Sequence, residues 1–254
     1  MRDDMGHPVD LGGPARRIVS LVPSLTESIA LTRPEALIGA TDWCTHPADL
    51  DVVRVRGTKN PDRKAIAALE PDLVLANREE NRELDIRKLR EAGIPVWVTV
   101  IETVEEACTS LRRLFSEGLQ WDVPDWLDEV ERIWLGPVPP IRARVAIPIW
   151  RDPWMVVGSS TFTGDLARRL GLDNVFGTAP LNEGGDRYPH VDLADVDRAD
   201  IDLVLLPDEP YVFSKDDGPE AFESAETVLV SGRSLTWYGP SMIAAHAELS
   251  EQLR

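Results

Sequence analysis

Residues 60–76, NPDRKAIAALEPDLVLA, contain one complete helix-to-strand unit and decide the predicted fold class. An amphipathic stretch runs over Asp62–Leu69, and the pair Pro71-Asp72 separates it from the apolar run Leu73–Ala76. A helix followed at once by a short apolar strand is typical of parallel sheets that helices cover. A crossover of this kind between parallel strands is expected to be right-handed.

The same alternation of apolar runs and amphipathic segments extends over both halves of the chain. The expected strands are Arg17–Val22, Leu37–Ala40, Leu73–Ala76 and Val96–Thr99, then Arg144–Trp150, Asn174–Phe176, Leu203–Leu206 and Thr227–Val230. The first expected helix begins at Ser24. The other expected helices cover Asp62–Leu69, Glu80–Ala92, Thr103–Phe115, Asp125–Leu135, Phe162–Leu170, Leu193–Ala199, Gly218–Ser224 and Pro240–Leu253. This pattern predicts an α/β protein.

Three short patterns mark the ends of helices. Ser24 and Glu27 follow Pro23 as S-x-x-E, which predicts a capping box at a helix start. Gly93, with Pro95 just beyond it, predicts a C-terminal cap. The stretch VGSSTF at residues 157–162 predicts a turn that leads into a helix N-cap.

The charge of the chain is strongly acidic. Among 254 residues there are 44 Asp plus Glu against 27 Lys plus Arg, and the formal net charge is -17. Binding to nucleic acid through a basic face is therefore not expected, because that mode depends on clustered Lys and Arg. Attraction to an anionic membrane surface loses support for the same reason.

A change of composition between Glu117 and Pro140 divides the chain. Trp121, Trp126 and Trp134 fall there, together with several prolines and one helical stretch. We therefore expect an N-terminal extension over residues 1–16, an α/β lobe over 17–117, a helical connector over 118–140 and a second α/β lobe over 141–254. Two lobes leave a cleft, and ligands of open α/β sheets bind outside the carboxyl ends of the strands.

The N-terminus and the cysteines favour a cytoplasmic monomer. Residues 1–17 alternate acids, prolines and glycines, and they lack the apolar run of a secretory signal. No stretch reaches the about 18 apolar residues of a membrane span. Cys44 and Cys108 are far apart, which predicts two buried thiols rather than a disulfide or a zinc site.

Aromatic and polar residues gather where the predicted strands end or on the neighbouring loops. They are Pro23, Ser24, Trp43, His46, Asn77 and Arg78 in the first half, and Trp154, Tyr188, His190, Trp237 and Tyr238 in the second. Such residues predict a large, flat ligand with polar margins. The alternative for Trp43, Trp154 and Trp237 is that each closes the edge of a hydrophobic core.

Motifs of catalysis are missing from the sequence. There is no G-x-S-x-G, no P-loop and no G-x-G-x-x-G, so no enzyme is predicted. His46 and His190 are weak candidates for a metal ligand, and the favoured interpretation is a solvated or hydrogen-bonded loop histidine. An enzyme that acts on a tetrapyrrole or metal chelate, with His46, Asp42 or Glu79 as acid or base, is kept as an alternative.

Seven phrases occur in an order that resembles a known family. They are RRIVSLVPSLTESI, LIGATDWCTHP, GTKNPD, IAALEPDLVLANREEN, LREAGIPVWV, RRLGLDNVF and LLPDEPYVF, and the resemblance spans Arg16 to Leu253. The chain looks like the class III periplasmic-binding-protein superfamily, the helical-backbone metal receptors, whose members bind vitamin B12, iron siderophores or haem. It is most similar to the vitamin B12-binding branch.

The resemblance implies two Rossmann-like α/β lobes joined by a single backbone helix, with a ligand cleft between them. By motif, Trp43 falls where the branch has an aromatic that contacts the corrin, and Asn77, Trp154 and Tyr188 fall at further pocket positions. The TWYGP phrase at 236–240 lies in a loop that also contacts the ligand in the family. A corrinoid such as cobalamin suits these aromatic and neutral groups, whereas anionic siderophores usually need arginine clusters.

Two positions depart from the transport members of the family. Those members carry on each lobe a surface Glu that pairs with arginines of the permease, and the matching residues here are Lys64 and Ala194. Docking to an ABC permease is therefore doubtful, and cytoplasmic handling or storage of the corrinoid is the leading hypothesis. The alternative is the substrate-binding component of an ABC transporter for cobalamin, an iron-siderophore or haem.

Overall fold

The computed structural model describes residues 1–177 and 186–253, which form two compact α/β units. Unit 1 consists of Met1–Ile101, Glu106–Val130 and Tyr238–Pro240. Unit 2 consists of Glu102–Glu105, Glu131–Trp237 and Ser241–Arg254. The predicted two-lobe α/β class is confirmed, while the predicted boundaries at residues 117 and 140 stay a prediction.

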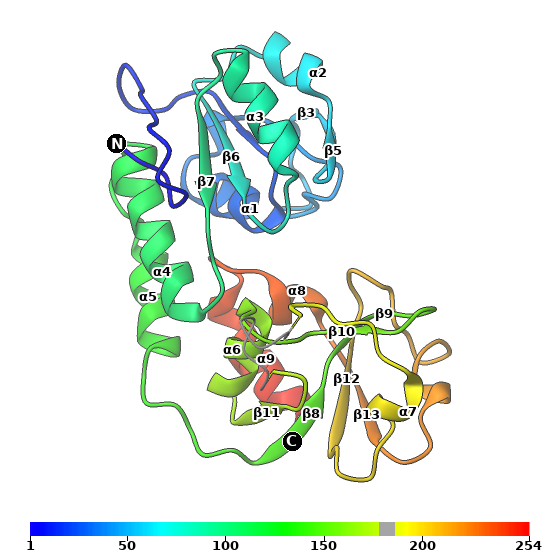
Figure 1. Ribbon diagram of the computed structural model, residues 1–254. Coiled ribbons are helices and arrows are strands. Elements are labelled where there is room, and N and C mark those ends of the chain that lie inside the picture. Colours follow the sequence, from blue (N-terminus) through cyan, green and yellow to red (C-terminus); the bar gives the residue numbers. More distant parts are fainter. Residues whose placement is uncertain (178–185, 254) are drawn as a thin grey trace. The chain divides into compact units, whose positions relative to one another are not determined.

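Unit 1 contains a parallel sheet of five strands in the order β3-β2-β1-β6-β7 (Figure 1). Its strands are β1 (Ile18–Ser20), β2 (Leu37–Ala40), β3 (Val53–Arg54), β6 (Leu73–Asn77) and β7 (Val96–Thr99). A small antiparallel pair, β4 (Arg56–Gly57) with β5 (Asn60–Pro61), lies between β3 and the next helix in the chain. The carboxyl ends of all five parallel strands share one edge of the sheet.

Helices connect the parallel strands of unit 1. They are α1 (Pro23–Thr32), a 3-10 turn (Pro34–Ala36), α2 (Arg63–Ala68) and α3 (Glu83–Glu91). A further helix, α4 (Val104–Arg113), continues as a π-helical turn over Leu114–Gly118, and α5 (Asp125–Trp134) follows it. The expected connector helix is α5, within which the chain passes from unit 1 to unit 2.

The two faces of the unit 1 sheet are covered by different helices. Ile66 of α2 and Leu89 of α3 pack in one cluster with Val19, Val74 and Val96 of the strands. Because side chains alternate along a strand, Trp97 points to the opposite face. There it meets Gly118 of the π-helical turn, since a Cβ added at Gly118 would lie 2.9 Å from the Trp97 ring.

Unit 2 repeats the architecture with a parallel sheet of four strands in the order β11-β8-β12-β13 (Figure 1). The strands are β8 (Ala143–Ala146), β11 (Leu172–Asn174), β12 (Leu203–Pro207) and β13 (Glu226–Val230), and β9 (Pro148–Trp150) pairs with β10 (Met155–Val156) as a hairpin. The helices are α6 (Phe162–Arg169), α7 (Leu193–Val196), α8 (Gly232–Thr236) and α9 (Met242–Gln252), with a 3-10 turn at Pro219–Ala221.

Several sequence predictions about helix ends are confirmed. Gly93 has a φ of 79° and ends α3, as predicted. Thr161 is the N-cap of α6, and its side chain accepts a hydrogen bond from the Gly164 N–H. Both predictions rest on local rules, positive φ for glycine and side-chain capping for threonine, that hold whatever surrounds the helix.

Other predictions about the elements are wrong. Residues 218–224 form only the 3-10 turn, α7 ends at Val196 rather than Ala199, and β11 lies two residues earlier than expected. The capping box at Ser24 is also absent. The helix begins one residue earlier, at Pro23, with Val22 as an N-cap that lacks a side-chain hydrogen bond. Ser24 therefore lies inside the helix, where its hydroxyl accepts a tertiary hydrogen bond instead.

No helix within residues 1–177 and 186–253 combines the length and the apolar character that a membrane-crossing segment requires.

We expect the indole of Trp97 to support unit 1 through packing and through the Arg113 guanidinium, which lies 5.6 Å from its ring centroid, but not through a hydrogen bond. Its N–H has no acceptor among the described residues, although the side chain is fully buried. Trp97→Ala should lower the free energy of unfolding by about 3–5 kcal/mol, because it leaves a large cavity. Trp97→Phe should cost clearly less, since it keeps a ring against Gly118 and removes the unsatisfied donor. Urea unfolding monitored by circular dichroism measures both, and equal losses would contradict the interpretation.

Candidate functional site

The carboxyl edge of the unit 1 sheet brings together residues that the sequence singled out. Pro23 and Ser24 follow β1, Trp43 and His46 follow β2, and Asn77 ends β6. Arg78 comes next and is exposed. Because parallel strands end at the same edge, these residues share one rim of the sheet.

Asn77 organises the loop that follows β6. Its buried side-chain amide donates to the Thr99 hydroxyl of β7 at 3.1 Å, and its oxygen accepts the N–H groups of Glu79 and Glu80 at 2.8 and 3.3 Å. The Asn77 N–H in turn donates to the side chain of Asn81 at 2.8 Å. The amide thereby fixes the backbone of the rim.

Tyr238 belongs to unit 1 although it is distant in sequence. Its backbone N–H donates to the Ser24 hydroxyl at 3.3 Å, and its phenol lies close to Asn77 and Thr99. Gly239, with a φ of 115°, makes this approach possible, since a Cβ there would lie 2.6 Å from the Ser28 hydroxyl. The structure thus brings Ser24, Asn77 and Tyr238 together.

Burial makes the Tyr238 phenol resistant to ionisation. The side chain is only 5% exposed, and removal from water raises its pKa well above the ordinary value. The carboxylate of Glu80 raises the pKa further, while Thr99 and Asn77 lower it in part. The group is therefore a neutral phenol across the physiological pH range.

Trp43 lies on a loop whose backbone is held by buried hydrogen bonds. The indole is 67% exposed, yet the next residue, Cys44, is fully buried and hydrogen-bonds through its thiol to Thr26 and Thr41. The Arg54 guanidinium donates to the carbonyls of Thr41 and Cys44 at 2.9 and 2.8 Å. A large apolar face is thus held in water by a rigid support.

The Cys44 thiol is structural rather than reactive. Burial raises its pKa, and the hydroxyls of Thr26 and Thr41 offset that rise only in part. Both cysteines are free and buried, as the sequence predicted.

His46 and His190 belong to different units. The Nδ1 atom of His46 lies 3.1 Å from the Thr45 hydroxyl. His190 is exposed and forms an isolated antiparallel β-bridge with Met155 of β10. No group of three or more His, Cys, Asp or Glu side chains that could hold a metal ion occurs in the described part of the chain.

In unit 2 the hairpin β9-β10 and its neighbours carry the aromatic candidates. Trp154 is 8% exposed and stacks on Phe213, with ring centroids 6.1 Å apart and an angle of 8°. Tyr188 is half-buried. It precedes Pro189, whose carbonyl accepts a hydrogen bond from the Val156 N–H of β10. Trp154 thus lies mainly within the core of unit 2, and its role toward a ligand stays a prediction.

Trp237 is buried and oriented by a carboxylate. Its indole N–H donates to Glu209 at 2.5 Å, and the Arg233 guanidinium lies 5.7 Å from the indole centroid. Burial raises the Glu209 pKa, whereas the Trp237 hydrogen bond and Arg233 lower it in part.

Sequence reasoning missed an aromatic pair on the surface of unit 2. Trp150, at the end of β9, is 45% exposed and contacts Tyr211 edge to face at 5.6 Å. The neighbouring Arg151 is neutralised by Asp217 and Glu220. Trp150 is the last residue of a predicted strand, and Trp43 lies shortly after the end of another. Its position at a strand end was therefore the signal by which the sequence could have identified Trp150.

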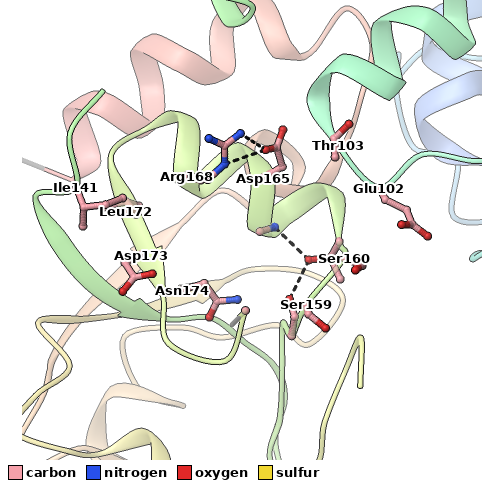
Figure 2. A pocket seen from close by; sticks show the side chains of 14 residues that line it. Glu102, Thr103, Ile141, Ser159, Ser160, Asp165, Arg168, Leu172, Asp173 and Asn174 are labelled. Atoms are coloured by element: carbon pink, nitrogen blue, oxygen red, sulfur yellow. Dashed lines mark hydrogen bonds and ion pairs between the residues drawn. The ribbon is translucent and has the colours of Figure 1, made fainter. Parts of the chain in front are cut away.

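A cavity of about 460 Å³ lies within unit 2. Its lining includes the 159–161 loop, the first turns of α6 and the edge strand β11 (Figure 2). None of the residues predicted to contact a ligand lines this cavity.

Comparisons with known proteins agree on one group of binding proteins, although no protein-family model matches. The chain is 26% identical over 175 residues to a vitamin B12-binding protein of Pectobacterium carotovorum, covering 65% of this chain and 63% of the relative. The vitamin B12-binding protein of Pectobacterium atrosepticum is 24% identical over 94% of this chain and 88% of the relative. The first of these alignments thus spans less than two thirds of the relative's length.

Solved structures have the same fold. The periplasmic vitamin B12-binding protein of Vibrio cholerae has a TM-score of 0.69 at 18% identity, covering 94% of this chain and 97% of that one. A periplasmic haem-binding protein from Roseiflexus has a TM-score of 0.70 at 19% identity, with the same coverage.

Two α/β units with parallel sheets and these neighbours define the class: the chain has the class III periplasmic-binding-protein fold. Its sequence is similar to that of proteins named vitamin B12-binding protein. The resemblance stated from the sequence is confirmed. The relatives are named as binding proteins.

The predicted cytoplasmic location is wrong. The neighbours from Vibrio cholerae and Roseiflexus are periplasmic proteins. The prediction rested on the residues before Ile18, on the two cysteines and on Lys64 and Ala194, and none of these features records a cellular compartment.

We expect Tyr238 to make the protein less stable in alkali. The unfolded chain loses the phenol proton near its ordinary pKa, while the folded protein retains it, so stability falls as pH rises above about 10. Tyr238→Phe should remove the part of this loss of stability that the phenol causes. Urea unfolding between pH 8 and pH 11 measures it, with Tyr188→Phe in unit 2 as the control. An unchanged pH dependence in Tyr238→Phe would contradict the argument.

Proposed function

We propose that the protein binds a corrinoid and serves as the substrate-binding component of an ABC transporter. The observation that carries the proposal is the match, over most of the chain, to relatives named vitamin B12-binding protein. Among the hypotheses drawn from the sequence, this transport alternative has better support than cytoplasmic storage, because the periplasmic neighbours argue against the latter.

The chemistry of the unit 1 rim supports a ligand of this kind. Trp43 offers a broad apolar face, and beside the same sheet edge lie the neutral side chains of Ser24, Asn77 and Tyr238. A corrin ring is broad and largely apolar, with neutral amides at its margin. Aromatic surfaces and uncharged polar groups complement both parts.

Haem is the second candidate, favoured by the haem-binding structural neighbours. A haem carries anionic propionates, which cationic side chains recognise best. Arg151, a cation on the surface of unit 2, is already bonded to Asp217 and Glu220. This pairing takes one cation away from a propionate, while the exposed Arg78 at the unit 1 rim keeps haem as the second candidate.

Titration with cobalamin tests the proposal. A shift of the corrin absorption bands and co-elution on gel filtration are expected at micromolar ligand. Haemin, titrated in parallel, should bind more weakly. Trp43→Ala should weaken cobalamin binding about tenfold, the loss expected when an aromatic anchor is truncated.

Leu84→Ala is the matched control, since Leu84 is an exposed apolar residue on α3, a helix that packs on one face of the unit 1 sheet. The absence of both a spectral shift and co-elution would refute the corrinoid proposal. His46→Ala and His190→Ala, compared by the spectrum of bound cobalamin, would reveal an axial ligand.

We also propose that docking to a permease does not use the family's two carboxylates. Lys64 is exposed in the first turn of α2, and Ala194 is exposed in α7. Asp195, next to Ala194, is exposed as well and could replace one of the two. A lysine facing permease arginines would add repulsion where transport members have attraction.

A charge-restoring variant tests this second proposal. Lys64→Glu combined with Ala194→Glu should bind a vitamin B12 permease of the family, held in nanodiscs, at least tenfold more tightly than the unaltered chain. Biolayer interferometry at low and high salt measures the gain, which salt should reduce. Equal binding by Lys64→Gln and Lys64→Glu single variants would contradict the charge argument.

A further inference from the structure

Residues 1–9, which we call the strap, fold back on themselves within unit 1. The two arms of the strap meet in an isolated antiparallel β-bridge between Arg2 and Pro8. Asp3 and Asp4 lie in the turn between the arms, where a hydrogen bond from the Asp4 N–H joins the strap to β7 (Figure 1). The strap thus brings two carboxylates to one side of the unit 1 sheet.

That side is the open edge of β7. This strand is the last of the sheet, so one of its sides has no neighbouring strand among the described residues. Alternate residues of a strand direct their backbone N–H and C=O groups to the same side. Thr99 faces β6, because its carbonyl accepts the Arg78 N–H at 3.0 Å. The backbone groups of Val96, Val98 and Val100 therefore face the open edge.

The strap provides partners for these backbone groups, as a neighbouring strand would. The Asp4 N–H donates to the Val98 carbonyl at 3.1 Å, and the Val98 N–H donates to the Asp3 carboxylate at 3.3 Å. The Val100 N–H donates to the Asp4 carboxylate at 3.1 Å. Two adjacent side chains and one backbone amide thus occupy the donors and the acceptor at the centre of the edge.

Two arginines hold the carboxylates of the strap in this position. Arg90 of α3 is bonded to Asp3 at 2.6 Å and also donates to the Val96 carbonyl at 3.3 Å. Arg113 of α4 is bonded to Asp4. The Asp3 side chain has no exposed surface, and a buried carboxylate is tolerated only where it is paired and hydrogen-bonded. The strap is therefore a specific part of unit 1 and not a loose end.

We propose that the strap covers the β7 edge and prevents it from pairing with a second copy of this chain. An uncovered strand edge is a template on which another chain can add a strand. The sequence of β7, Val-Trp-Val-Thr, has a high preference for strands, so its uncovered edge would pair readily. The strap occupies the same backbone groups that the second copy would need. This role does not depend on which ligand the protein binds.

A variant of the full chain that opens the strap tests the proposal. Asp3→Ala combined with Asp4→Ala removes both acceptors of the edge N–H groups. Sedimentation velocity at about 100 μM, enough to populate a dimer with a micromolar Kd, should show a dimer for this variant and a monomer for the unaltered chain. Asp10→Ala combined with Asp122→Ala is the control, because it removes two exposed acids from the same unit. The control should remain monomeric.

A further substitution tests whether the dimer uses the β7 edge. Val100→Pro removes one N–H group that faces the edge, and proline is tolerated at such positions. Added to the variant with Asp3→Ala and Asp4→Ala, it should weaken the dimer about tenfold, because the second copy loses a donor.

Hydrogen exchange gives a measurement that does not require the double variant to fold. Asp4→Ala alone keeps Asp3 in place and removes the acceptor of the Val100 N–H. In dilute samples the Val100 amide should then exchange about tenfold faster than in the unaltered chain. The amide of Thr99, on the side that faces β6, should change little.

The proposal would be overturned by a double variant that is folded by circular dichroism yet monomeric at the same concentration. An unaltered chain or a control that forms the same dimer, a dimer that Val100→Pro does not weaken, or an unchanged Val100 exchange rate in Asp4→Ala would also contradict it. Cobalamin titrations are carried out separately, so failure of the strap proposal and failure of the corrinoid proposal remain distinguishable.

Discussion

Asn77, at the end of β6, and Asn81, in the loop that follows, hold the carboxyl edge of the unit 1 sheet in place. Asn77 joins β7 through Thr99 and caps the N–H groups of the loop that begins at Glu79, while Asn81 donates to the Leu21 carbonyl after β1. A buried polar group left unpaired costs about 1–3 kcal/mol, so loss of either amide would release several strand ends together. The backbone of the loop after β6 and its link to the end of β1 follow from that network.

Tyr238 shows how the rim extends beyond the local sequence. Its backbone reaches Ser24 and its phenol lies by Asn77, so a segment near the end of the chain becomes part of unit 1. Gly239 is required for this approach, because its positive φ and the nearby Ser28 hydroxyl leave no room for a side chain. The loop that carries Trp43 is held by a different interaction, the hydrogen bonds from the Arg54 guanidinium to its backbone carbonyls.

The sequence alone was sufficient for most of the elements and for part of the rim. Periodicity predicted β6 and α3, and the motif TDWCTHP singled out Trp43 before its exposure was known. The capping box at Ser24 failed because Pro23 can start the helix one residue earlier, and the tertiary bond to Tyr238 then uses the serine. Local patterns do not record contacts between distant residues, so neither the Asn77 network nor the core position of Trp154 could be predicted.

The pairing of charges, rather than their number, argues for a neutral ligand. The net charge of -17 would repel an anion only weakly across salt water, because exposed charges are screened within about 10 Å. The local arrangement is more decisive. Arg151 is committed to Asp217 and Glu220, and Arg233 lies over the Trp237 ring near Glu209. With these two cations engaged, the exposed face of Trp43 is the apolar surface of the unit 1 rim that can meet a ligand, and a corrin ring would present a matching apolar face.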